Sequence, residues 1–98
     1  MTQHFEFVGE LFKWEGKAAW HFVALPAGVA DEIEAAAGIK RGFGSVPVLV
    51  TVGTSAWATS LFPDKSRGTY LLPVKKAVRE AEEWHDGADA TVVLQLRE

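Results

Sequence analysis

The chain contains no cysteine among its 98 residues. This absence excludes a disulfide framework and a thiolate metal site, and it favours a reducing compartment such as the cytoplasm. The sequence also lacks any apolar run approaching the roughly 20 residues that a membrane helix needs. Its first residues show no cationic start followed by an apolar stretch, so we expect no signal peptide. A cytoplasmic protein without a membrane segment is therefore expected.

Acidic residues are almost missing from the middle of the chain. Residues 40–79 hold seven cations and one acid, whereas residues 1–39 hold two cations and six acids, and residues 80–98 hold one cation and six acids. The net charge of −3 therefore conceals a basic segment between two acidic ones. One interpretation is that these segments lie side by side and neutralise each other on the surface. The other is that the basic segment faces an anionic partner.

The start of the chain predicts a β-hairpin. Residues 4–14 and 18–25 alternate with a period of two, as half-buried strands do, around a turn at residues 15–17. On the second strand we expect Trp20 and Phe22 to face the core. Trp20→Ala is then expected to unfold the domain or nearly so, because truncating a buried aromatic residue costs about 3–5 kcal/mol.

A helix and a strongly patterned strand follow. The helix is expected to start at Pro26 and to end at Gly38. The strand places β-branched residues in strict alternation, at Val46, Val48, Val50 and Val52. Pro47 cannot donate to a ladder, so this strand is expected at a sheet edge or distorted near its start. Gly53 is expected to take a positive φ in the turn that follows.

The second half of the chain completes an all-β pattern. Pro73 is expected to open a second helix that runs to about His85. Six strands and two short helices in one domain over residues 1–98 predict a small six-stranded β-barrel with helices at its ends. The other expected elements are a return strand at 56–62, a loop at 63–68, a short strand at 69–72 and a closing strand at 91–96.

Several short motifs occur in an order that resembles domain-of-unknown-function family 1905 along nearly the whole chain. They are Trp20–Pro26, Arg41–Gly44, Val48–Gly53, Trp57–Pro63 and Tyr70–Arg79, followed by Gly87 and Asp89. The resemblance implies a small β-barrel of the double-split type, and it brings no established activity, substrate or catalytic residue. In that family the glycine is usually followed directly by the aspartate, whereas Ala88 separates the two here. A fainter, fold-level likeness to swapped-hairpin AbrB-type DNA-binding domains covers about residues 69–94 and carries little functional weight.

Signals for catalysis are weak. His21 is interpreted as a structural, hydrogen-bonded histidine, and Ser55 and Ser60 lack the Gly-x-Ser-x-Gly context of an activated nucleophile. The three histidines are too scattered along the chain to predict a metal site. We therefore expect no catalytic residue, no metal and no cofactor, and a small enzyme is the least favoured function.

We expect instead a non-enzymatic binding module with a basic surface for an anionic small molecule or a nucleic acid. The candidate site residues are Trp57, Thr59, Arg67, Tyr70, Lys75, Lys76 and Arg79. The first four are expected in a groove at the barrel mouth, where aromatic and cationic groups hold a flat or anionic ligand. Helical spacing is expected to place the last three on one cationic face, with Arg67 added to it.

A structural role is the alternative to binding. In that interpretation exposed apolar groups and an unpaired edge strand form a homodimer. The net charge of −3 argues against strong non-specific binding of duplex nucleic acid, because that binding grows with the number of phosphates neutralised.

Overall fold

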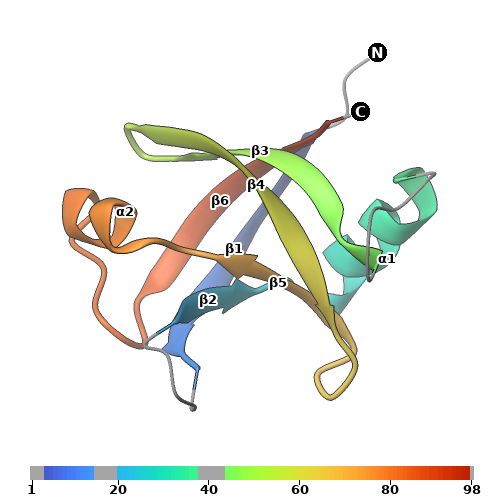
Figure 1. The fold of residues 1–98 in the computed structure, drawn as a ribbon, viewed down its shortest axis with the longest axis horizontal. Helices are drawn as coiled ribbons and strands as arrows, with labels where there is room; N and C mark the ends of the chain where they lie inside the picture. Colours follow the sequence, from blue (N-terminus) through green and yellow to red (C-terminus); the bar gives the residue numbers. More distant parts are fainter. Residues whose placement is uncertain (1–3, 15–19, 38–43, 98) are drawn as a thin grey trace.

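Six antiparallel strands close into a barrel in the computed structural model, which describes residues 4–14, 20–37 and 44–97 (Figure 1). The strands are β1 (His4–Lys13), β2 (His21–Ala24), β3 (Val46–Val52), β4 (Ser55–Asp64), β5 (Thr69–Pro73) and β6 (Asp89–Leu96). They follow the order β1-β2-β5-β4-β3-β6, and each pairs with two neighbours. Two helices, α1 (Ala27–Ala36) and α2 (Lys76–Ala81), lie on opposite sides of the barrel in Figure 1. The expected six-stranded barrel with two short helices is confirmed.

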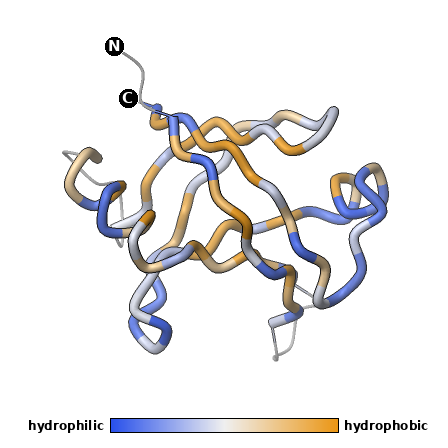
Figure 2. Tube along the Cα trace, turned by 180° about the vertical axis from the view of Figure 1, so that it is seen from behind, coloured by the Kyte–Doolittle hydropathy of each residue, from blue (hydrophilic) through white to orange (hydrophobic). Residues whose placement is uncertain are grey.

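The core is built from the inward faces of the strands. The alternation expected for β3 is confirmed, because its four valines are at most 3% exposed. On β6, which pairs with β3, Val92 and Leu94 are fully buried. Figure 2 shows hydrophobic residues along the barrel strands and hydrophilic ones in the β4–β5 loop. Burial of these apolar side chains is the main favourable contribution to folding.

The prediction for the inward face of β2 is wrong. His21 and Val23 are buried. Trp20 is 54% exposed, and Phe22 is half-buried. The pairing explains the difference, because Val23 lies opposite the fully buried Leu11 of β1. Successive side chains on a strand point to opposite faces, so the neighbouring strand decides which set points inward. Trp20→Ala is therefore expected to leave the domain folded, contrary to the expectation from the sequence.

The edge position or distortion expected near the start of β3 is limited to Val46 and Pro47, and the rest of the strand is internal. β3 pairs with both β4 and β6. Pro47 is the second residue of the strand, and the pairing with β6 begins only at Val48. The Pro47 carbonyl accepts a hydrogen bond from the Arg97 N–H at 3.0 Å. Because Pro47 stands at the beginning of the strand, its missing N–H does not interrupt the ladder with β6.

Pro73 ends β5 and does not open α2. It lies opposite Phe22 of β2, and the next N–H, that of Val74, donates to the His21 carbonyl at 2.9 Å. The chain is therefore still extended beyond the proline, and α2 is shorter at both ends than expected. β4 extends to Asp64, so the loop expected at residues 63–68 is shorter as well.

Helix α1 begins directly after Pro26, as expected. Ala30 and Ile33 form its buried side. The Tyr70 hydroxyl on β5 donates a hydrogen bond to the Glu34 carboxylate, which fastens α1 to the barrel. The helix end expected at Gly38 and the turn expected at residues 15–17 lie outside the described residues.

Strand β1 changes its partner along its length. Residues 4–10 pair with β6, and residues 11–13 pair with β2. At the change, the Leu11 N–H donates to the Ala88 carbonyl at 2.9 Å, and the Leu11 carbonyl accepts from the Gly87 N–H at 2.8 Å. The additional alanine before β6 therefore leaves this turn closed onto β1.

The β3–β4 turn confirms the positive φ expected for Gly53, which is +50°. This φ strains any other side chain, and a Cβ here would collide with the Glu82 Oε1 atom. Glu82 would then have to give up the hydrogen bond that it accepts from the Ser55 hydroxyl at 2.9 Å. Gly53→Val should therefore lower the free energy of unfolding by about 1–3 kcal/mol, measured by urea denaturation. Thr54→Ser is the control, and an equal loss of stability in both variants would contradict this account.

Candidate functional site

An open cleft with a volume of about 570 Å³ lies at one end of the β1–β2 hairpin, and we call it the aromatic cleft. Its lining residues are Trp14, Trp20, Phe22, Phe62, Pro63, Asp64, Lys65 and Leu71. Trp14, Trp20 and Phe62 are 40%, 54% and 43% exposed. Soluble proteins rarely expose several large apolar side chains next to one another. Such a group around a hollow is typical of a binding site for a partner or ligand.

Contacts between rings set the shape of the aromatic cleft. Phe22 stacks against Trp20, with ring centroids 6.0 Å apart and an interplanar angle of 19°. Phe22 also meets Trp14 edge-on, at 5.7 Å and 74°. The Trp14 N–H donates to the Trp20 carbonyl at 2.7 Å, so the backbone holds the two indoles at neighbouring positions. Aromatic pairs of this kind contribute about 0.5–1.5 kcal/mol each beyond their burial, which pre-organises the ring surface.

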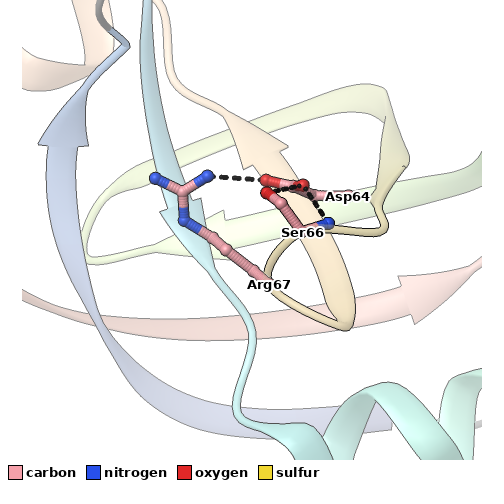
Figure 3. Close-up of polar contacts among 3 residues, drawn as sticks. All are labelled: Asp64, Ser66 and Arg67. Atoms are coloured by element: carbon pink, nitrogen blue, oxygen red, sulfur yellow. Dashed lines mark hydrogen bonds and ion pairs between the residues drawn. The ribbon is translucent and has the colours of Figure 1, made fainter.

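Polar contacts within the β4–β5 loop join Asp64, Ser66 and Arg67 (Figure 3). The Asp64 Oδ1 atom accepts hydrogen bonds from the Ser66 N–H at 3.0 Å and from the Ser66 hydroxyl at 2.7 Å. The Oδ2 atom accepts from Arg67 Nη1 at 2.6 Å. The guanidinium carbon lies 4.4 Å from the centroid of the Phe12 ring and 5.7 Å from that of Trp14, within cation–π range. Asp64 therefore holds Arg67 over the aromatic rings.

The charges at this end of the barrel favour an anion. The hydrogen bond from the Ser66 hydroxyl, aided by Arg67, lowers the pKa of Asp64 below its usual value, so the carboxylate stays ionised near neutral pH. The Asp64 side chain is only 9% exposed, and Arg67 balances its charge. Lys65 also lines the cleft and is exposed. The cleft therefore combines ring surfaces with an exposed lysine, and Arg67 beside Trp14 balances its one carboxylate, Asp64.

A second pocket, of about 390 Å³, shares Trp20 with the aromatic cleft, and we call it the Trp57 pocket. Its lining residues are Trp20, His21, Trp57, Ala58, Thr59, Pro73, Val74 and Lys75. Three of the candidate residues predicted from the sequence, Trp57, Thr59 and Lys75, are therefore brought together. Lys75 is exposed and stands immediately before α2.

His21 is hydrogen-bonded, as the sequence predicts, and it is buried because its face of β2, not that of Trp20, points inward. Its Nε2 atom lies 2.8 Å from the Asp86 Oδ1 atom. Its carbonyl accepts the Val74 N–H, and its side chain is almost completely buried. These contacts connect β2 with the segments before and after α2, which is a structural role.

Of the four residues expected in a groove at the barrel mouth, two lie apart from the Trp57 pocket. Arg67 belongs to the β4–β5 loop, on the side of the barrel opposite to α2 in Figure 1, where its guanidinium lies over Phe12 and over Trp14, a ring of the aromatic cleft. Tyr70 is buried, and its hydroxyl is hydrogen-bonded to Glu34, so its ring belongs to the core. The groove expected from Trp57, Thr59, Arg67 and Tyr70 together is therefore divided among three places.

The cations of α2 are divided as well. Lys75 has an extended backbone conformation, with φ −75° and ψ 158°, and the helix begins after it. Helical spacing therefore relates only Lys76 and Arg79. Lys76 is exposed, and Arg79 is half-buried with no hydrogen-bond partner for its Nε atom within the described part of the chain. Arg67 does not join these cations, because its loop lies across the molecule.

The sequence missed the aromatic cleft because it assigned the β2 aromatics to the core. The available signal was that residues 20–25 are apolar on both faces, although only one face of a barrel strand can point inward. Trp20 and Phe22 then had to cover an outer surface. Phe62, which is 43% exposed, joins them from β4 only through the pairing of β4 with β5.

Two further observations bear on the chemistry. Within residues 4–14, 20–37 and 44–97, no three histidine, aspartate or glutamate side chains gather as potential metal ligands. Neither of the two helices found there has the length and apolar character required to cross a bilayer.

Comparison with known families supports the resemblance seen in the motifs. The model of a family described as a domain of unknown function, DUF1905, matches residues 7–94. This range includes every residue that lines the aromatic cleft and the Trp57 pocket. No curated protein matches the chain.

Proposed function

The chain belongs to the DUF1905 family, a domain of unknown function, and we propose a function from the geometry of the site. The protein is a non-enzymatic binding module for a flat, anionic small molecule. The ring of the ligand would lie in the aromatic cleft, and its anionic group would lie beside Lys65 and Arg67. The proposal includes a cytoplasmic location, which the cysteine-free sequence favours.

The observation that carries the proposal is a set of exposed rings beside a fastened guanidinium. Trp14, Trp20 and Phe62 surround a cleft whose volume of about 570 Å³ lies within the range of small-molecule sites. Arg67 is held against two rings by Asp64, so a ligand would have to order few side chains on binding. Low ordering cost favours affinity.

The chemistry of the cleft selects for one class of ligand. An aromatic ring that stacks on an exposed indole gains about 1–3 kcal/mol. The cations Lys65 and Arg67 favour a phosphate or carboxylate on the same molecule. A nucleoside monophosphate has both features, and adenosine monophosphate (AMP) is a suitable probe.

Trp20→Ala should weaken the binding of AMP by about 5- to 150-fold, because one stacking surface is lost. AMP should raise the melting temperature of the parent chain, since a ligand that binds only the folded state stabilises it. The variant itself should fold normally because Trp20 is 54% exposed. Val8→Ala is the matched control, since Val8 is 57% exposed on β1 and does not line the cleft.

The experiment can reject the proposal. Thermal-shift and tryptophan-fluorescence titrations at low salt should include AMP, other nucleotides and sugar phosphates. Absence of any stabilisation across this set would exclude an anionic small molecule. Binding that is equally weakened in Trp20→Ala and Val8→Ala would show that the ligand lies elsewhere. Stabilisation should decrease with added salt, because salt screens the cations.

A homodimer is the second candidate, favoured by the same exposed rings, which a second copy of the chain would cover. The edge-strand route to a dimer loses its support, because every strand within the described residues has two partners. Sedimentation velocity over a range of concentrations separates the two candidates. A dimer that dissociates in Trp20→Ala would favour assembly over ligand binding.

A further inference from the structure

The aromatic cleft and the Trp57 pocket are two neighbouring hollows with similar chemistry. The aromatic cleft offers Trp14 and Phe62 with Lys65, and the Trp57 pocket offers Trp57 with Lys75. Trp20 lines both hollows, so they meet at one exposed indole. Each hollow therefore presents at least one ring other than Trp20 together with one lysine.

We propose that the aromatic cleft and the Trp57 pocket form one continuous site for single-stranded nucleic acid, with one nucleotide in each. This inference rests on the proposed function, because it assigns the aromatic cleft as the first of two subsites. A single strand repeats a flat base and a phosphate at every step, which matches a surface that repeats rings and a lysine. Stacking of bases on aromatic side chains, with cations along the backbone, is the general way in which proteins hold single strands.

Local charge supports this assignment. The carboxylate closest to the first subsite, Asp64, is balanced by Arg67 and bound to Ser66. Asp86, whose carboxylate lies 2.8 Å from the His21 Nε2 atom, does not line the second subsite. Lys65 and Lys75 are both exposed. Each hollow therefore offers one exposed lysine to a phosphate of the strand, Lys65 in the β4–β5 loop and Lys75 beyond the other end of β5.

The same geometry disfavours a duplex. The bases of a duplex are stacked on each other, so their faces are not available to Trp20 or Trp57. A duplex could then be held only by attraction between its phosphates and the cations of the protein. That attraction is weak here because the chain carries a net charge of −3. Sequence preference should be small, because stacking accepts every base.

The test compares one nucleotide with two. Thymidine monophosphate, 5′-phosphorylated dithymidylate and a fluorescein-labelled octathymidylate are titrated into the parent chain, followed by tryptophan fluorescence and anisotropy. The dinucleotide is expected to bind about 5- to 150-fold more tightly than the mononucleotide, the range that one additional stacked base contributes. The octamer should bind at least as tightly as the dinucleotide, and a duplex of the same sequence with its complement much more weakly.

Two adjacent lysines supply the matched variants. Lys75 lines the Trp57 pocket, whereas Lys76 lines neither hollow and is exposed on α2. Lys75→Ala should weaken the dinucleotide by several-fold, leave the mononucleotide unchanged, and reduce the slope of log K against log salt by about 0.7. Lys76→Ala removes the same charge, but it should change the dinucleotide affinity and the salt slope less than Lys75→Ala does.

The outcomes separate this inference from the proposed function. If mononucleotides bind in a manner that depends on Trp20 but the dinucleotide binds no more tightly, the two-subsite inference is wrong and the proposed function stands. If Lys75→Ala and Lys76→Ala have equal effects, the Trp57 pocket is not a subsite. Equal affinity for the duplex also overturns the inference. If no nucleotide binds at all, both proposals fail.

Discussion

Leu11→Ala should lower the free energy of unfolding by about 2–5 kcal/mol, because it removes a fully buried side chain and leaves a cavity. Leu11 stands where β1 changes its partner, opposite the buried Val23 of β2. Its backbone also closes the turn before β6 through Gly87 and Ala88. The cavity therefore lies where three segments of the barrel meet, and the surroundings cannot collapse into it without breaking these pairings.

Urea denaturation and thermal melting measure this effect. Each kcal/mol should lower the melting temperature by roughly 4–8 °C in a domain of this size. Val8→Ala is the control on the same strand, since Val8 is exposed and its truncation should cost well under 1 kcal/mol. If the two variants melt at the same temperature, the inward face of β1 has been assigned incorrectly.

Gly9→Ala should be the second strongly destabilising change, by about 1–3 kcal/mol, although it adds only one methyl group. A Cβ at Gly9 would lie 2.6 Å from the Cγ1 atom of Val23 and 2.8 Å from the carbonyl oxygen of Ala24. Real Cβ atoms do not approach other heavy atoms this closely. The Ala24 oxygen belongs to the backbone of β2, so it cannot turn away as a side chain would, and the sheet must separate locally.

Gly28→Ala is the matched control for Gly9→Ala. Gly28 lies in α1, and a Cβ there would meet nothing within 4 Å. Alanine is the better helix former, so this variant should be as stable as the parent or more stable by up to about 1 kcal/mol. Opposite signs for the two glycine changes in one denaturation series would confirm that close approach of β1 and β2 is the cause. A neutral Gly9→Ala would refute it.

The expectations that succeeded rest on local chemistry. Alternating valines form a strand wherever one face can be buried, and β3 buries all four. Gly53 takes the positive φ that the short turn requires. His21 makes the hydrogen bond expected of a structural histidine, with Asp86. In each case the residue type alone restricts the backbone conformation, the burial or the hydrogen bonding of the side chain.

The expectations that failed concern which neighbour an element meets. Strand β2 is apolar on both faces, and only its pairing with β1 turns Val23 inward and Trp20 outward. A proline such as Pro73 is compatible with the start of a helix and with the end of a strand. Its pairing with Phe22 of β2 places it in strand β5. The basic segment was read as one surface, but β5 carries its two ends to opposite sides of the barrel.

The sequence by itself determined that the chain folds as a small six-stranded barrel, since period-two patterns, turns and family motifs depend on short stretches of chain. It also determined that the chain carries four tryptophans and a basic middle segment. Only the tertiary structure decided where aromatic and cationic side chains gather, in the aromatic cleft and the Trp57 pocket on either side of Trp20. The physical reason is that a pattern with a period of two defines two faces of a strand but does not say which is inside. That choice is made by the closure of the barrel, through pairings between residues far apart in the chain.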